Sequence, residues 1–178
     1  ANNRLDDFLF YIAIDKAFLD PLRWDPEEFR EAVKNAKSIL YLADNAGEIA
    51  LDRLLLEQLP LEKITVTVRG YPVLNDATME DAQEVGLTEM VQVISNGSDA
   101  PGILLDDCDA QFCKIFEQAD LILAKGQGNY ETLSDFQKDI FFLLKAKCSV
   151  IARDIGCHVG DFILRRISMP ACLPSDIE

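Results

Sequence analysis

Histidine is almost missing from this sequence, since His158 is the only one among its 178 residues. Zinc sites built from several histidines are therefore excluded, and a Ser-His-Asp triad would depend on this one side chain. A lone histidine is more often a structural residue than a catalyst. We expect the chemistry of this protein to rest on other side chains.

Basic residues are also scarce, with 17 Lys and Arg against 31 Asp and Glu and a formal net charge of -14. Proteins that bind the phosphate backbone of nucleic acids need clustered Lys and Arg. We therefore expect no nucleic-acid partner. If the substrate is itself an anion, this acidic chain must neutralise it locally, with a metal cation or with a few well-placed basic side chains.

Long apolar runs are absent too: none approaches the roughly 18 residues of a membrane-spanning helix, and no signal peptide is visible. Cysteines are few, odd in number and without the spacing of a metal site. They are Cys108, Cys113, Cys148, Cys157 and Cys172. We expect reduced, buried thiols in a cytoplasmic protein that has no contact with a membrane.

The residues that are present form a strand-helix-strand pattern near the beginning of the chain. A continuous apolar run over 38–43 is typical of a strand in a parallel sheet that is covered on both faces. Asp44 and Asn45 follow it, and a helical pattern then runs from Glu48 to Pro60. The apolar positions that carry this helix are Leu51, Leu55 and Leu59. A second strand is expected over 64–68.

Such a unit marks a right-handed crossover in a parallel sheet, in which ligands bind outside the carboxyl ends of the strands. Further apolar runs predict the other elements. Strands are expected over 90–95, 120–124 and 158–164, and one more strand is expected in either 141–144 or 149–152. Helices are expected over 26–37, 79–85 and 109–118. We therefore predict an α/β fold, a three-layer α/β/α sandwich with a mainly parallel, Rossmann-like sheet.

Polar residues follow three of these expected strands, at the point where each strand ends. They are Asp44 with Asn45, then Arg69, Asn75 and Asp76, then Lys125 with Gly126, Gly128 and Asn129. In a doubly wound sheet such ends can converge on one crevice. Carboxylate and amide oxygens are ligands suited to Mg²⁺ or Mn²⁺, and a glycine turn with a lysine suits a phosphate.

Each cluster also has a structural interpretation. An Asp-Asn pair before a glycine, as at Asp44, is a common turn and helix cap. Asp76 could cap the following helix, and Arg69 could simply pair with an acid. The glycine turn over 125–128 is shorter than the phosphate loop of P-loop enzymes. Only its position after a strand supports a phosphate-binding role for this turn.

Three motifs in this order resemble the DUF89 family of metal-dependent damage-control phosphatases, in its archaeal and bacterial branch. These motifs span 44–49, 69–78 and 125–131, and the segment 148–161 is similar to the closing segment of that branch. The resemblance covers nearly all of the chain from about Ala36 onward.

The resemblance implies a hydrolase that cleaves phosphate monoesters of small metabolites, such as sugar phosphates or damaged forms of them, with Mg²⁺, Mn²⁺, Co²⁺ or Ni²⁺. By this resemblance Asp44, Asn45 and Asp76 are the metal ligands, and Lys125 holds the substrate phosphate. Asp44, Asp76 and Lys125 are then the catalytic residues. The phosphate pocket would be completed by Arg69, Asn75, Gly126 and Asn129.

The same resemblance divides the chain into a helical lead-in over 1–35 and an α/β metal- and phosphate-binding domain over 36–178. Members of this branch usually carry a helical region upstream, of which this chain has about the last turns. If that region covers the pocket, we expect the 178 residues to bind metal and to turn over poorly. The expected macromolecular partner is this missing helical region or, in a homo-oligomer, a second copy of the chain.

Two other functions stay open. The apolar segment 5–20 favours a non-catalytic metal- or metabolite-binding domain that needs a helical partner. An S-adenosylmethionine-dependent methyltransferase also uses glycine between a strand and a helix, but it would need Gly-x-Gly where this chain has Asp-Asn-Ala-Gly over 44–47.

Overall fold

A seven-stranded sheet organises the computed structural model, which describes residues 22–23 and 26–167. The strand order is β1-β7-β6-β5-β2-β3-β4. The strands are β1 (Leu22–Arg23), β2 (Ile39–Leu42), β3 (Ile64–Val68), β4 (Gln92–Ser95), β5 (Leu121–Lys125), β6 (Ile140–Lys145) and β7 (Phe162–Ile167). Neighbouring strands are parallel except β6 and β7, which are antiparallel. The predicted mainly parallel sheet is confirmed.

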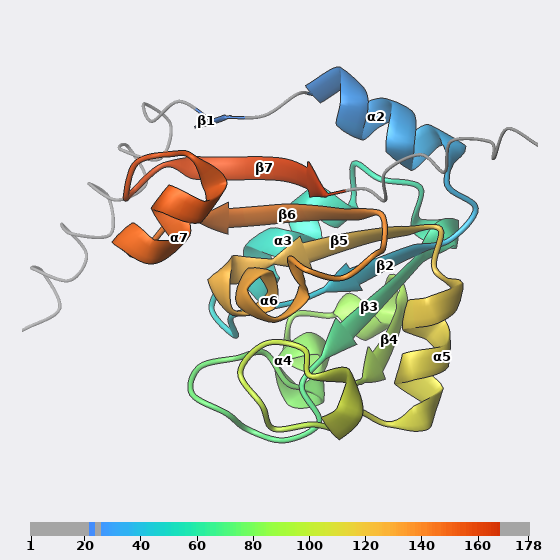
Figure 1. Ribbon diagram of the computed structural model, residues 1–178. Coiled ribbons are helices and arrows are strands. Elements are labelled where there is room, and N and C mark those ends of the chain that lie inside the picture. Colours follow the sequence, from blue (N-terminus) through green and yellow to red (C-terminus); the bar gives the residue numbers. More distant parts are fainter. Residues whose placement is uncertain (1–21, 24–25, 168–178) are drawn as a thin grey trace, which may run out of the picture.

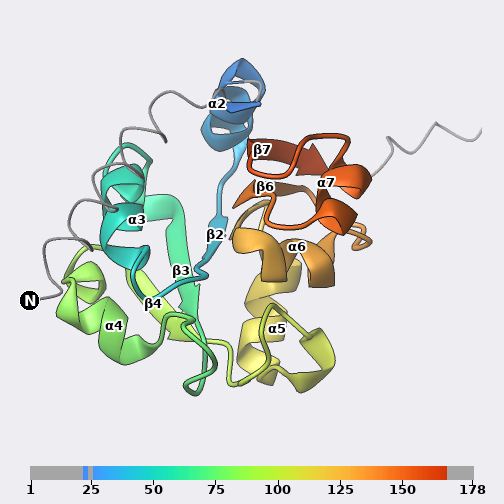
Figure 2. The same ribbon diagram turned by 90° about the vertical axis from the view of Figure 1, so that its left-hand side faces the viewer.

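Helices cover both faces of this sheet, as Figures 1 and 2 show. One face carries α2 (Pro26–Asn35), α3 (Ile49–Leu56) and α4 (Met79–Glu84); the other carries α5 (Ala110–Gln118), α6 (Gly126–Leu133) and α7 (Ser149–Ile155). Single 3₁₀ turns occur at η1 (Leu61–Lys63), η2 (Leu87–Glu89) and η3 (Leu105–Asp107). Side chains of β2 alternate between the two cores, with Ile39 and Tyr41 on the first side and Leu40 and Leu42 on the second. The three-layer sandwich is confirmed. None of the described helices has the length and apolar character needed to cross a membrane.

The buried face of α3 differs from the predicted one. Its buried residues are Ile49, Asp52 and Leu56. Of the predicted apolar positions, Leu55 and Leu59 pack half-buried against the core, whereas Leu51 is 65% exposed. Two apolar stripes overlap in this helix, and the sequence pattern does not choose between them. The stripe that contains the acid is the buried one because Asp52 meets a lysine from the sheet, as described below.

The last third of the chain resolves an ambiguity between strand and helix. Of the two apolar segments considered for one strand, 141–144 lies in β6 and 149–152 lies in α7. The final strand was placed over 158–164, but β7 begins only at Phe162, and the side chain of His158 is 83% exposed. The four described cysteines, Cys108, Cys113, Cys148 and Cys157, are half-buried rather than buried as expected. Cys172, the apolar segment 5–20 and most of the lead-in over 1–35 lie outside the described residues.

The centre of the sheet is a topological switch point. After β2 the chain builds β3 and β4 on one side and then crosses to place β5 on the other side of β2. At the amino ends of β2 and β5, the Asp120 carboxylate accepts the N–H groups of Lys37 and Ser38 at 2.9 and 3.0 Å. In open sheets of this kind, ligands bind at the opposite, carboxyl end of the strands at the switch point.

Candidate functional site

The carboxyl ends of β2 and β3 are joined by backbone hydrogen bonds. Asn45 and Asp76 form an isolated antiparallel bridge, and the N–H of Ala77 donates to the carbonyl of Asp44 at 2.8 Å. The first two polar clusters of the sequence therefore meet in space. Asn75 takes part through its carbonyl, which accepts a backbone N–H at 2.8 Å, while the residue itself is exposed.

A buried arginine connects these residues to the third cluster. Arg69, only 2% exposed, donates from Nε to Asp76 Oδ2 at 2.7 Å and from Nη2 to Asn129 Oδ1 at 3.1 Å. Asn129 is fully buried and donates from Nδ2 to the carbonyl of Lys125 at 2.7 Å. The alternative in which Arg69 pairs with an acid is thus realised, and the pair links two strand ends.

Together these residues form one group, which we call the strand-end cluster. Its members are Asp44, Asn45, Arg69, Asp76, Lys125, Gly126 and Asn129. They come from the ends of β2, β3 and β5 and from the first turn of α6. The structure thus brings together the residues that the sequence placed after three separate strands.

Gly126, the first residue of α6, lies directly against the carboxylate of Asp44. Its φ of +79° is a left-handed conformation that favours glycine, and a Cβ there would lie 2.0 Å from Asp44 Oδ2. Glycine is therefore needed at this position for two independent reasons. The beginning of a helix also favours a neighbouring negative charge.

Burial and neighbouring charges change the acidity of Asp44. Its pKa is raised from 3.8 to about 6, mainly by burial and then by the negative charges of Asp76 and Glu48, against the opposing effect of Lys147 and Arg69. Among the described residues, no hydrogen bond or ion pair reaches this carboxylate. It is a half-buried acid for which the described part of the chain supplies no directly bonded partner.

This arrangement fits a divalent cation. The carboxylates of Asp44 and Asp76 and the amide oxygen of Asn45 are hard oxygen donors. Asp76 keeps one carboxylate oxygen beyond its bond to Arg69, and Asn45 Oδ1 already accepts the N–H of Gly47 at 2.7 Å. Within the described ranges, no three His, Cys, Asp or Glu side chains are grouped so that they could hold a metal. An ion here would take two acids and an amide, and water or substrate for the rest.

Lys125 and Lys147 bring positive charge to the same edge of the sheet. Lys125 Nζ is held by Asp52 Oδ1 at 2.6 Å and Glu48 Oε2 at 3.2 Å. Lys147 is exposed and follows β6, and its N–H donates to Gln127 Oε1 at 2.9 Å. Our sequence reasoning missed both Asp52 and Lys147. The signal for Lys147 was its place just after an apolar run, as for the other clusters.

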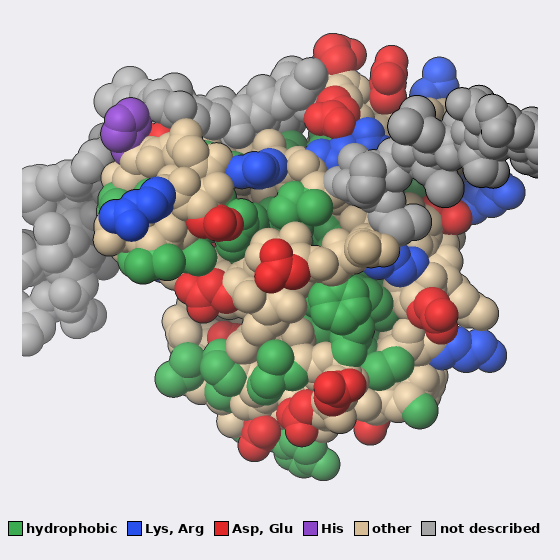
Figure 3. Space-filling model, in the orientation of Figure 1, with side chains coloured by type: hydrophobic (Ala, Val, Ile, Leu, Met, Phe, Trp, Pro, Cys, Tyr) green, Lys and Arg blue, Asp and Glu red, His purple; other side chains and the backbone are tan. Residues whose placement is uncertain are grey.

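The surface agrees with an acidic protein. On the face shown in Figure 3, the coloured Lys and Arg side chains stand apart among acidic and apolar ones and form no continuous basic patch. Phosphate recognition on this chain therefore depends on individual basic residues rather than on a broad positive field.

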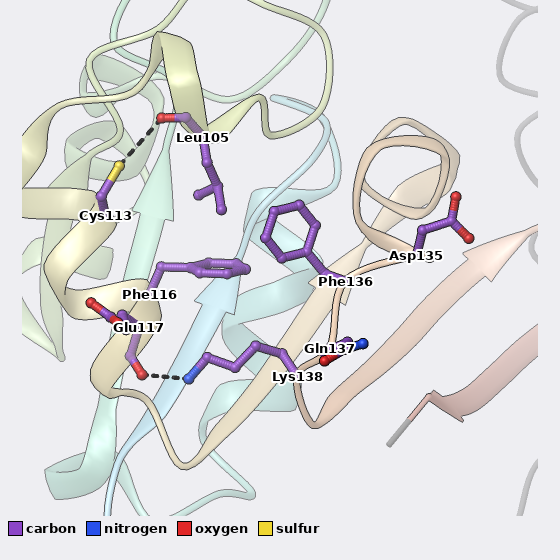
Figure 4. A pocket seen from close by; sticks show the side chains of 8 residues that line it. All are labelled: Leu105, Cys113, Phe116, Glu117, Asp135, Phe136, Gln137 and Lys138. Atoms are coloured by element: carbon purple, nitrogen blue, oxygen red, sulfur yellow. Dashed lines mark hydrogen bonds between the residues drawn. The ribbon is translucent and has the colours of Figure 1, made fainter. Parts of the chain in front are cut away.

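An apolar pocket of about 590 Å³ lies away from the strand-end cluster, beside α5 and toward the amino ends of β5 and β6 (Figure 4). It is lined by Leu105, Cys113, Phe116, Glu117, Asp135, Phe136, Gln137 and Lys138. Two of its polar groups are used internally: the Cys113 thiol donates to the Leu105 carbonyl at 3.4 Å, and Lys138 donates to the carbonyls of Glu117 and Ala119. A binding site needs convergent polar groups to orient its ligand, so the strand-end cluster is the better candidate.

Comparison with known proteins gives the same indication. Residues 10–163 match the family model of the damage-control phosphatase ARMT1-like domain. The chain belongs to this family. A damage-control phosphatase of Archaeoglobus fulgidus is 44% identical over 145 residues, which are 79% of this chain and 50% of that protein. The damage-control phosphatase PH1575 of Pyrococcus horikoshii is 41% identical over 156 residues, which are 85% of this chain and 53% of that protein.

A crystal structure from this family has the same fold. The DUF89 family protein PH1575 of Pyrococcus horikoshii, solved at 2.04 Å resolution, superposes with a TM-score of 0.81 at 39% identity, over 86% of this chain and 56% of that one. The chain thus spans about half the length of the curated relatives it matches. The predicted membership of the DUF89 phosphatases is confirmed.

Proposed function

We propose that this chain is the metal- and phosphate-binding part of a damage-control phosphatase, which hydrolyses phosphate monoesters of small metabolites with the help of a divalent metal ion. The observation that carries the proposal is the half-buried Asp44 carboxylate, which lacks a partner on the described chain and lies beside Asp76. The family name of the relatives supports the reaction class.

Each residue has a definite task in this proposal. Asp44, Asn45 and Asp76 hold the ion, which when bound supplies Lewis-acid polarisation of the phosphoryl oxygens. Arg69 keeps Asp76 in place, because its guanidinium is fixed between that acid and Asn129.

Lys125 contributes a buried positive charge for the phosphoryl group. Gly126 lets the first turn of α6 approach Asp44 and presents N–H groups at the same edge, where an anion is favoured. Asn75, whose side chain is exposed at the rim, is proposed to contact substrate.

The family membership favours this reading over a methyltransferase. The non-catalytic alternative keeps one observation in its favour, namely that the chain covers only about half of its relatives. A part of an enzyme can bind metal and still need the remainder for turnover. The choice of Mg²⁺, Mn²⁺, Co²⁺ or Ni²⁺, the cytoplasmic location and the oligomeric state stay predictions.

The test is phosphate release from a panel of sugar phosphates and p-nitrophenyl phosphate, after chelator treatment and with each of the four metals added back. Release that needs metal and is lost in Asp76→Asn supports the phosphatase. Asparagine keeps an oxygen for the Nε–H of Arg69 and removes the charge that the ion needs, and circular dichroism checks that the variant folds. The control is Asp99→Asn, which removes an exposed acid. Absence of release with every metal contradicts hydrolysis by this chain, and a rise in melting temperature with metal in that case supports the non-catalytic alternative. Absence of both release and any metal-induced rise in melting temperature contradicts the proposal as a whole.

A further inference from the structure

Asp52 is an acid in a place where helices usually bury apolar residues. It lies on the inner face of α3 with Ile49 and Leu56, and only 5% of it is exposed. A buried carboxylate is costly unless a partner compensates its charge. That partner is Lys125, whose Nζ lies 2.6 Å from Asp52 Oδ1. The acid is therefore built into the core opposite the lysine at the end of β5.

Lys125 has two acidic partners that differ in their freedom to move. Its side chain is about as buried as the core around it, at 9% exposed, and Asp52 is fixed beneath it. Glu48, 3.2 Å from the same Nζ, has a side chain that is 46% exposed. Asp52 is thus a fixed inner partner, while Glu48 can turn toward solvent. An anion that enters at this edge can replace Glu48 without disturbing Asp52.

The charges around Lys125 balance in favour of the ammonium form. Burial lowers the pKa of Lys125, but Asp52 and then Glu48 raise it, and the net direction is upward. Tyr41 of β2 also faces Asp52, and its pKa is raised well above the usual range by burial and by that acid, so the hydroxyl stays protonated. The buried Tyr41 hydroxyl and Asp52 Oδ2 each have no hydrogen-bond partner among the described residues. Asn129, from α6, is neutral, and its hydrogen bond to Lys125 goes to the backbone carbonyl rather than to the ammonium group.

We infer that Asp52 is a positioning residue of the phosphate site: it holds the ammonium of Lys125 charged and directed to the place where the substrate phosphoryl group replaces Glu48. This inference rests on the proposed function and names a residue that acts through Lys125 rather than on substrate. Replacing buried ion pairs by apolar residues is often neutral or stabilising, so stability alone is a weak reason for an acid at this position.

The inference is tested first on the lysine itself, without any assay of activity. Lys125 is labelled with acetic anhydride over a range from about pH 8 to about pH 12, and its reaction is followed by mass spectrometry. In Asp52→Asn the midpoint of labelling is expected to fall by more than about one pH unit. Burial lowers the pKa of Lys125, and in this variant only Glu48 is left to raise it. An unchanged midpoint overturns the inference, whether or not the protein hydrolyses phosphate esters.

Steady-state kinetics then separate position from charge. In Asp52→Asn we expect KM for a phosphate ester to rise about tenfold or more, and the alkaline limb of kcat/KM to move to lower pH. Asp52→Glu keeps the charge but moves it by one methylene, so labelling should stay near wild type while KM rises. Wild-type KM in Asp52→Glu would overturn the positioning role. Absence of turnover in the wild type contradicts the proposed function alone, because the labelling result stands by itself.

Asp139→Asn is the matched control for loss of an ion pair. Asp139 binds Arg166 through two hydrogen bonds, at 2.7 and 2.8 Å, at the amino end of β6 and away from the strand-end cluster. This variant is expected to lower the melting temperature without shifting the labelling of Lys125. If Asp52→Asn does not fold, as judged by circular dichroism, Asp52→Glu still decides the inference through its KM.

Discussion

Replacing Asp44 by asparagine is expected to stabilise the metal-free protein while it abolishes metal binding. The carboxylate is half-buried, lies near Asp76 and Glu48, and has no hydrogen-bond partner among the described residues. Its pKa is therefore higher in the folded protein than in the unfolded chain. A carboxyl group of this kind costs the most stability at pH values above its folded pKa of about 6. The cost shrinks as the pH falls below that value and is gone below the unfolded pKa of about 3.8.

The magnitude follows from that pKa. A change from 3.8 to about 6 corresponds to about 3 kcal/mol at neutral pH, and solvent screening at a half-buried site reduces this to about 1 to 2 kcal/mol. For a chain of this size about 1 kcal/mol shifts the melting temperature by about 2 to 4 °C. Asp44→Asn should thus melt about 2 to 8 °C higher than wild type near neutral pH without metal.

The assay is thermal unfolding with chelator, with and without added Mn²⁺ or Mg²⁺, at several pH values. The advantage of Asp44→Asn should shrink as the pH falls through 6, because the wild-type carboxyl group then becomes neutral. Metal should raise the melting temperature of the wild type and leave the variant unchanged. A variant that melts below wild type at neutral pH without metal would refute the reasoning, because it would show that the Asp44 charge is compensated by the chain. Asp99→Asn controls for the loss of one negative charge.

Two further substitutions test the architecture of the cluster. Gly126→Ala places a methyl group 2.0 Å from Asp44 Oδ2 on a backbone with φ of +79°. We therefore expect this variant to lose the metal-induced rise in melting temperature. A retained rise would contradict the role of Asp44 as a ligand. Arg69→Lys cannot bond Asp76 and Asn129 together, so we expect a loss of about 2 to 4 kcal/mol in the free energy of unfolding measured with urea. A loss below about 0.5 kcal/mol would contradict the role of Arg69 as the link between the two strand ends.

Much of the fold could be read from the sequence because its signals are local. The apolar run Ile64-Thr-Val-Thr-Val68 predicted a strand over 64–68, and β3 has these bounds. Parallel strands end at one edge of a sheet, so the polar residues after β2, β3 and β5 could be expected to converge. The strand order itself depends on contacts between residues far apart in the chain.

The parts that were missed depend on such distant contacts. From the sequence, Asp52 looks like an ordinary polar position of an amphipathic helix. Its role depends on a contact with Lys125, which is 73 residues away in the chain. Leu51 was misplaced for the same reason, because the acid determines which face of α3 turns inward. The segment 149–152 lies in α7, which ends at Gly156, a residue with the left-handed φ of +80° that is typical after a helix end. Apolar runs this short do not distinguish helix from strand.

The switch point has a consequence for how the protein unfolds. The strand-end cluster draws Asp44 from the central strand, Asp76 from the β3 side and Lys125 from the β5 side, so it exists only while both halves of the sheet are paired with β2. A ligand bound there contacts both halves of the sheet, so its binding free energy adds to the free energy needed to separate them. Amide hydrogens of β2 and β5 should then exchange more slowly when metal and phosphate are bound together. Ligand binding at the strand-end cluster would thus be detected as slower hydrogen exchange in the middle of the sheet, where we expect the slowest local opening.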